Sequence, residues 1–277
     1  MAFWDKISSR GKVEDRRGFS GLAIGGGSLG LGGLAVVLLL NYLSGGNIGD
    51  VISQLPAQVP ASQLTSENFE GADNYEVFTS TVLGSTNDYW TKIFAENNLT
   101  YTPPKLVLFR GATQGGCGIS SSEVGPHYCP LDQTIYLDET FFDELQARFQ
   151  AKGGDVAESY VLAHEVGHHA QNLLGIIDDV NQNSTRGNAN ELSVKQELQA
   201  DCFAGLWANS IKDLGVFEPG EINEAMDAAS AIGDDKIQKT IEGRITPENW
   251  THGSSEQRVT WFDRGFNSGS LSQCNTF

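Results

Sequence analysis

Two histidines four positions apart, His164 and His168, place the tightest restriction on how this chain can fold. Four residues advance an α-helix by about 400°, so a helix projects both imidazoles from one face, one turn apart. Imidazoles placed in this way can bind a single Zn²⁺, and Glu165, about 100° away, can reach a water molecule on the ion. Three of the five histidines fall in this one segment. The pattern therefore predicts a helix over residues 155–174 that carries a metal site.

A catalytic zinc site needs a third protein ligand and an open position. The extended pattern H-E-x-x-H-x-x-G-x-x-H is absent, because Gln171 stands at its glycine position. Glu197 and Asp201 lie four residues apart on another expected helix, so Glu197 can supply the third ligand while Asp201 accepts the N–H of a ligand histidine. Glu191 is the alternative ligand. Considered without the histidines, two carboxylates at this spacing on an acidic chain would more simply be solvent-exposed side chains on one face of a helix.

The net charge of −17 is distributed unevenly along the 277 residues. Residues 1–20 hold five basic and three acidic side chains, a balance of +2, so the remainder carries −19. No charged residue stands between Arg17 and Asp50, and about 20 uncharged residues can cross the hydrocarbon core of a bilayer. The overall acidity argues against a nucleic-acid partner, because binding phosphates needs clustered Lys and Arg.

This charge distribution predicts a membrane protein with a single transmembrane helix. The basic flank places the N-terminus in the cytoplasm and everything after the helix outside, in the periplasm or the extracellular space. A cleaved signal peptide and a buried Gly-rich helix are the alternatives. Gly21 and Gly25 would permit close helix packing, and so a homo-oligomer formed through the anchor. The expected regions are a basic cytoplasmic segment over 1–20, the transmembrane helix over 21–43, a flexible linker over 44–74 and a folded domain over 75–277.

Hydrophobic periodicity and turn residues outline the folded domain. Several helices and two short strands predict a predominantly helical α+β domain with a small sheet. Residues 114–130 and the segment from 175 to about 189 read as loops. The expected helices cover residues 76–97, 140–150, 155–174, 191–214 and 221–232, and the expected strands cover residues 105–110 and 133–137.

Four segments in combination resemble one known family, the bacterial neutral zinc metallopeptidases. These segments are His164–Gly175, Glu197–Gly205, Gly125–Gln133 and Thr251–Arg258. The resemblance covers most of the chain outside residues 44–75. It implies a gluzincin-like, zincin-like domain anchored in a membrane, with His164 and His168 as zinc ligands and Glu165 as a catalytic residue. His127 is a departure, because phenylalanine is usual at that position in the family.

These parts predict hydrolysis of a peptide or protein substrate. Zinc would activate a water molecule and polarise the scissile carbonyl, while Glu165 would move the proton to the leaving amine. His252 is the candidate to stabilise the oxyanion, although it could equally be a surface or capping residue ahead of a helix over 257–262. The alternative function is a catalytically silent zinc-binding protein of the cell envelope that acts as an interaction module.

The four cysteines allow three disulfide pairings. Cys117 and Cys129 flank a Gly-rich loop, and a bridge between Cys202 and Cys274 would tie the C-terminal tail to the helix that carries Glu197. We therefore favour 117–129 with 202–274, which suits a domain outside the reducing cytoplasm. Zinc ligation by Cys202 is the alternative.

Overall fold

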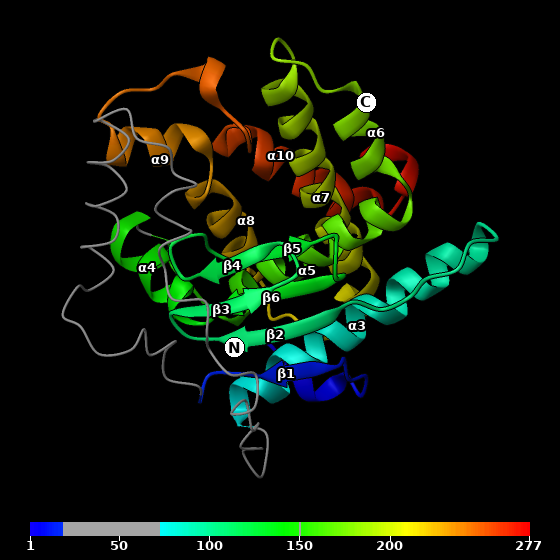
Figure 1. Ribbon diagram of the computed structural model, residues 1–277. Coiled ribbons are helices and arrows are strands. Elements are labelled where there is room, and N and C mark those ends of the chain that lie inside the picture. The colour runs from blue at the N-terminus through cyan, green and yellow to red at the C-terminus, as the bar shows by residue number, and fades with distance from the viewer. Residues whose placement is uncertain (19–72, 150) are drawn as a thin grey trace, which may run out of the picture. The chain divides into compact units, whose positions relative to one another are not determined.

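The computed structural model describes residues 1–18, 73–149 and 151–277 (Figure 1). These residues form a mostly helical α+β unit with two small sheets. The transmembrane helix expected over 21–43 and the linker expected over 44–74 lie outside the described residues. Within the part of the chain that is described, we find no helix with the length and apolar character needed to cross a bilayer.

The larger sheet has the strand order β1-β2-β6-β5, in which β5 runs antiparallel to β6 and the other neighbours are parallel. The strands β3 and β4 form a separate hairpin. Both β2 and β6 were expected, whereas β4, β5 and the second half of β3 lie in residues 114–130, which were expected to be a loop. The strands are β1 (Val13–Asp15), β2 (Lys105–Phe109), β3 (Ala112–Gly115), β4 (Gly118–Ser121), β5 (His127–Cys129) and β6 (Thr134–Asp138).

Successive side chains of β2 and β6 point to opposite faces of the sheet. Nearly all of them are buried, so both faces of the sheet are covered at these two strands. One face joins the main core with the helices, and the other forms a smaller cluster next to the β3–β4 hairpin, where Gly115 lies against the ring of Tyr136. The first face presents Leu106, Leu108, Ile135 and Leu137, and the second presents Val107, Phe109, Cys129 and Tyr136.

The helices expected from the sequence are present, with ends shifted by a few residues. Helix α6 occupies part of the loop expected after residue 175, and α9 was not expected. In Figure 1, α3 runs beside β1 and β2, whereas α7 and α10 lie on the other side of α5. The helices are α3 (Asn74–Glu96), α4 (Thr140–Phe149), α5 (Asp155–Leu173), α6 (Ile176–Asn183), α7 (Ala189–Ile211), α8 (Ile222–Ala231), α9 (Asp234–Ile241) and α10 (Ser255–Ser268). Short 3₁₀ turns include η1 (Trp4–Lys6) and η5 (Leu271–Cys274).

Residues 1–18 belong to the same folded unit as the residues after 73. Strand β1 pairs in parallel with β2. The indole of Trp4 stacks on that of Trp207 with ring centroids 6.4 Å apart, and its Nε1 donates to Asp155 Oδ2 at 2.8 Å. The N-terminal segment is therefore packed into the domain through its side chains as well as through its backbone.

This packing corrects the expected domain organisation. We expected residues 1–20 to be a separate cytoplasmic segment and residues 75–277 to be a domain on the opposite side of a membrane. Strands of one sheet pair directly by backbone hydrogen bonds, so β1 and β2 must lie on the same side of any membrane. The structure therefore does not support opposite sides for residues 1–18 and the domain.

Helices α7 and α10 cross with their backbones in contact at two glycines. A β-carbon on Gly205 would clash with the carbonyl oxygen of Phe262, and one on Gly265 would clash with the carbonyl oxygen of Cys202. Both positions therefore require glycine. The close crossing allows a side chain of α10 to reach Asp201 inside the protein.

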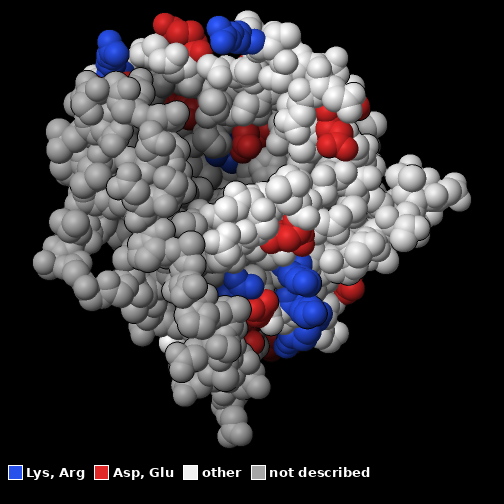
Figure 2. All heavy atoms as spheres, in the orientation of Figure 1, with Lys and Arg blue, Asp and Glu red and all other residues white. Residues whose placement is uncertain are grey.

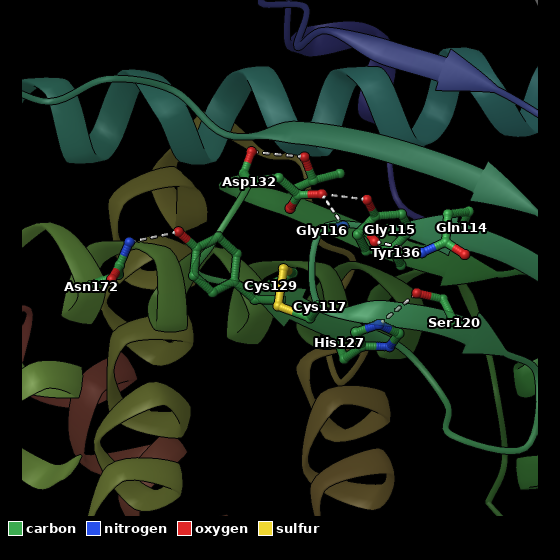
Figure 3. Close-up of a disulfide and its surroundings, with 12 residues drawn as sticks. Gln114, Gly115, Gly116, Cys117, Ser120, His127, Cys129, Asp132, Tyr136 and Asn172 are labelled. Carbon is green, nitrogen blue, oxygen red and sulfur yellow. Dashed lines mark hydrogen bonds between the residues drawn. A yellow bond between two sulfur atoms is a disulfide. The ribbon is translucent and has the colours of Figure 1, made fainter. Parts of the chain in front are cut away.

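Both disulfides pair as favoured from the sequence. The Cys117–Cys129 bridge joins the turn between β3 and β4 to β5, as Figure 3 shows. The Cys202–Cys274 bridge joins α7 to η5 near the C-terminus. Two disulfides are typical of a protein that folds outside the reducing cytoplasm.

Glu158, on the first turn of α5, gives the fold a predictable pH dependence. Burial, with the nearby carboxylates of Asp155 and Glu139, raises the pKa of Glu158 to about 7. The folded state therefore disfavours ionised Glu158, and stability is lost as pH rises from the unfolded pKa of about 4.3 through 7. We expect Glu158→Gln to raise the free energy of unfolding at pH 8 by about 2 kcal/mol and to change it little at pH 4.

Urea denaturation at the two pH values measures this difference. The control is Glu144→Gln on α4, which removes a carboxylate whose side chain is 59% exposed. An equal effect of Glu158→Gln at both pH values would contradict the assignment.

Candidate metal centre

The candidate ligand atoms come from α5 and α7, which pack against each other. His164 Nε2 lies 3.1 Å from His168 Nε2, because the two side chains leave α5 one turn apart. Glu197 on α7 places Oε2 3.2 Å from His164 Nε2 and Oε1 3.3 Å from His168 Nε2. The two histidines and the glutamate predicted as ligands are therefore brought to one point.

The geometry of this group fits a zinc ion. Tetrahedral zinc with bonds of about 2.0 to 2.1 Å separates its ligand atoms by about 3.3 Å, close to the separations seen here. Two imidazoles and one carboxylate form a known type of catalytic zinc site, which keeps a position open. His164 and His168 are 5% and 8% exposed, and the Glu197 side chain is 15% exposed, so the group is shielded but can be reached from solvent.

A buried network orients His164. Its Nδ1 donates to Asp201 Oδ1 at 2.8 Å, as predicted, which leaves Nε2 free to bind a metal. Tyr160, one turn earlier on α5, donates its hydroxyl to the same oxygen at 2.6 Å. Arg258 on α10 donates from Nε and Nη2 to the two oxygens of Asp201, each at 2.9 Å. The positive charge of the guanidinium thus compensates the negative charge of Asp201, which is fully buried.

The charges of the network shift three pKa values. Burial alone would raise the pKa of Asp201, but Arg258 and His164 hold it below its usual range. Burial alone would lower the pKa of His164, but Asp201 and Glu197 raise it to about 10. Burial of Glu197 is likewise outweighed by His168 and His164, which hold its pKa well below the usual range. A ligand histidine must be neutral, so metal binding here releases protons.

His168 is oriented by a neutral partner instead. Its Nδ1 lies 2.9 Å from Oε1 of Gln171, one turn further along α5. The Gln171 side chain is completely buried. Each ligand histidine therefore has a partner for Nδ1, a carboxylate for His164 and an amide for His168.

Two alternative ligands are excluded by their contacts. Glu191 is 67% exposed and its Oε1 lies 2.8 Å from Lys195 Nζ, on the outside of α7. Cys202 is bonded to Cys274 and has no free thiolate. Glu165, the predicted catalytic carboxylate, is 6% exposed and lies next to His164 on α5.

The structure does not join His252 to the ligands. Its side chain is half exposed, and Nδ1 lies 3.2 Å from Asp234 Oδ1. Among the described residues, we find no hydrogen bond between His252 and the ligand group, so its catalytic role stays a prediction. His127 also lies elsewhere: its ring stacks on Tyr136, and Nε2 lies 3.0 Å from Ser120 Oγ (Figure 3).

His169, beside the second ligand, fixes the position of β5. It is fully buried, and burial lowers its pKa to about 4, so the ring is neutral. Its Nε2 donates to the Thr102 carbonyl at 2.6 Å, and its Nδ1 accepts from the Tyr128 hydroxyl at 2.9 Å. Asn172 Nδ2 donates to the same hydroxyl, a bond drawn in Figure 3. Helix α5 is thereby tied to the edge strand of the sheet.

Three supporting residues were not identified from the sequence. Tyr160 and Gln171 stand four residues before His164 and three after His168, so helical spacing could have indicated them. Arg258 had no such signal, because it is 57 residues from its partner Asp201.

Comparisons with known proteins agree with this metal centre. A family model described as "Putative neutral zinc metallopeptidase" matches residues 2–277. The uncharacterized protein YpfJ of Escherichia coli (strain K12) is 45% identical over 284 aligned positions, which cover 99% of this chain and 98% of the relative. The uncharacterized protein Rv2575 of Mycobacterium tuberculosis (strain ATCC 25618 / H37Rv) is 48% identical over 187 aligned positions, 64% of this chain and 63% of the relative.

No solved structure matches the chain. The family match extends over nearly the whole sequence, including β1 and the C-terminal disulfide. The chain therefore belongs to the neutral zinc metallopeptidase family, and its cofactor is Zn²⁺, for which His164, His168 and Glu197 form a fitting site.

Proposed function

We propose that this protein is a zinc-dependent peptidase that hydrolyses peptide bonds outside the cytoplasm. The observation that carries the proposal is the convergence of His164, His168 and Glu197, with the buried Glu165 next to His164 on α5. Zinc held there would supply Lewis-acid polarisation of a carbonyl group and activation of water at neutral pH.

The residues of the chain would handle the proton and the substrate. The carboxylate of Glu165 accepts a proton from the attacking water and delivers it to the leaving amine. His252 can act as a donor to the developing oxyanion, because Asp234 orients the ring through Nδ1 and the side chain is half exposed. Asp234 itself is held by the backbone N–H groups of Thr251, His252 and Gly253.

The surface suggests which peptides would bind. Figure 2 shows a hollow between the strands β4 and β5 and the helices above them in this view, with acidic side chains at its border. The chain as a whole carries a net charge of −17. Such a field attracts basic peptides and repels acidic ones, so it favours neutral or basic peptides over acidic ones. Membrane attachment and association into a homo-oligomer remain proposals from the sequence. Because β1 and β2 lie on the same side of any membrane, such an attachment would not be a single helix that crosses the bilayer between them.

Metal analysis and a peptide library test the proposal together. The purified protein should contain about one zinc ion per chain. It should cleave members of an unbiased peptide library, lose this activity to a chelator and regain it with added zinc. Full zinc occupancy without cleavage of any peptide would overturn the peptidase function and favour the silent zinc-binding protein.

The variant His252→Ala tests the oxyanion role. We expect kcat to fall by about 10²-fold with little change in KM, because the donor acts on charge that develops in the transition state. Steady-state kinetics on a cleaved peptide measures the effect. His127→Phe is the control, since that ring contacts Tyr136 and Ser120 and should leave kcat unchanged. A similar loss in both variants would rule out a specific role for His252.

A further inference from the structure

We infer that Gln171 and Gln199 form an amide relay that fixes the orientation and the protonated nitrogen of His168 and connects the metal centre to the Cys202–Cys274 disulfide. Both glutamines are positioning residues. The inference rests on the zinc site of the proposed function and does not require that the protein cleaves peptides.

The relay is a continuous chain of buried hydrogen bonds. His168 Nδ1 lies 2.9 Å from Gln171 Oε1. Gln171 Nε2 donates to the backbone carbonyl of Gln196 at 2.7 Å and to Gln199 Oε1 at 3.0 Å. Gln199 Nε2 in turn donates to the backbone carbonyl of Cys274 at 3.1 Å. Gln171 and Gln199 are 0% and 6% exposed, so water does not replace these partners.

Two backbone carbonyls set the direction of every bond in the relay. A carbonyl oxygen can only accept, so the Gln196 carbonyl requires the NH₂ group of Gln171 and turns its Oε1 toward His168. The Cys274 carbonyl fixes Gln199 in the same way. Because Oε1 of Gln171 can only accept, His168 must carry its proton on Nδ1, which leaves the Nε2 lone pair for the metal.

The neutral character of the relay suits its position. Glu197 and Asp201 already place two carboxylates in this buried region, with Glu165 nearby. A further carboxylate beside His168 would have to lose its hydration without a cation of its own, which costs several kcal/mol. An amide orients the imidazole without adding a charge.

The far end of the relay depends on the C-terminal tail. Cys274 is held against α7 by its bond to Cys202, and Thr276 Oγ1 donates to the Lys195 carbonyl at 2.8 Å. The bridge therefore keeps the Cys274 carbonyl in place for Gln199. Loss of the bridge should loosen Gln199 and, through Gln171, the orientation of His168.

Zinc affinity measured by competition with a chromogenic chelator tests the relay without any substrate. Methionine has a similar shape to glutamine but can neither donate nor accept in this way, so Gln171→Met should weaken zinc binding about 10- to 100-fold. The control is Gln238→Met, because Gln238 also makes side-chain hydrogen bonds, to Thr246 and Trp250, but belongs to α9. We expect its zinc affinity to match the unchanged protein.

Nitrogen-15 spectra of labelled histidine give a second readout. In the zinc-loaded protein, His168 should be protonated on Nδ1, and in Gln171→Met this signal should broaden or shift while that of His164 persists. A purely structural defect would alter both histidines and would lower the melting temperature of the zinc-free protein well below that of Gln238→Met.

Matched disulfide variants test the connection to the tail. The double variant Cys202→Ala/Cys274→Ala should lose zinc affinity, whereas Cys117→Ala/Cys129→Ala should keep it. Zinc binding by Gln171→Met within twofold of the unchanged protein would overturn the relay, and equal affinity in both double variants would overturn its connection to the tail. If Gln171→Met does not fold, Gln199→Met is judged by the same twofold limit. A protein that binds zinc but cleaves no peptide would refute the proposed function and leave this test intact.

Discussion

Replacing Glu165 by glutamine should leave about one zinc ion per chain in place while lowering kcat for peptide hydrolysis by about 10³-fold. Glutamine has nearly the same shape as glutamate but cannot accept the proton of the attacking water. The ligands His164, His168 and Glu197 keep their positions, so metal content should not change. Metal analysis and steady-state kinetics on the same preparation measure both quantities.

The control for this variant is Glu191→Gln. Glu191 is also on a helix of the site, but its side chain is 67% exposed and pairs with Lys195. Its replacement should change neither zinc content nor kcat. Activity of Glu165→Gln within tenfold of the unchanged enzyme would show that another group takes the proton.

Replacing Arg258 by methionine should lower the free energy of unfolding by about 3 to 5 kcal/mol. Arg258 is 2% exposed and makes two hydrogen bonds to Asp201, which is completely buried. Without the guanidinium, Asp201 keeps its negative charge in a place that water does not reach, with His164 and Tyr160 as its remaining partners. For a domain of this size the melting temperature should fall by about 10 °C.

Thermal or urea unfolding of the zinc-free protein measures this cost apart from metal binding. Arg264→Met is the matched control on α10, because Arg264 is exposed and lies over the ring of Trp261. It should change stability by less than about 1 kcal/mol. Adding Asp201→Asn to Arg258→Met should recover part of the loss, since it removes the unpaired charge. A cost below 1 kcal/mol for Arg258→Met would mean that Asp201 is not held by this pair.

The sequence was sufficient for the parts of the site that lie within one helix. The spacing of His164 and His168 on α5, and that of Glu197 and Asp201 on α7, follows from the rise and turn of an α-helix. Local geometry of this kind does not depend on the rest of the fold. The same reasoning could have reached Gln171, because it stands one turn after His168.

Contacts between distant segments could not be obtained in this way. Strand β1 was assigned to a separate cytoplasmic segment because its charges favour the inner side of a membrane, whereas it pairs with β2 about 90 residues later. The strands β4 and β5, with the second half of β3, were expected to be a loop because glycine is frequent there, and three or four residues carry too little alternation to identify a strand.

By itself, the sequence determined His164 and His168 as candidate zinc ligands, because their spacing is a property of the helix, and it favoured Glu197 over Glu191 as the third ligand. It also favoured the two disulfide pairings found in the structure. The tertiary structure decided how each ligand histidine is held: Arg258 reaches Asp201 where α7 and α10 cross at glycine, and the Cys274 carbonyl ends the relay from His168. Hydrogen-bond direction and charge compensation depend on which groups meet in space, and the packing of helices and tail brings those groups together.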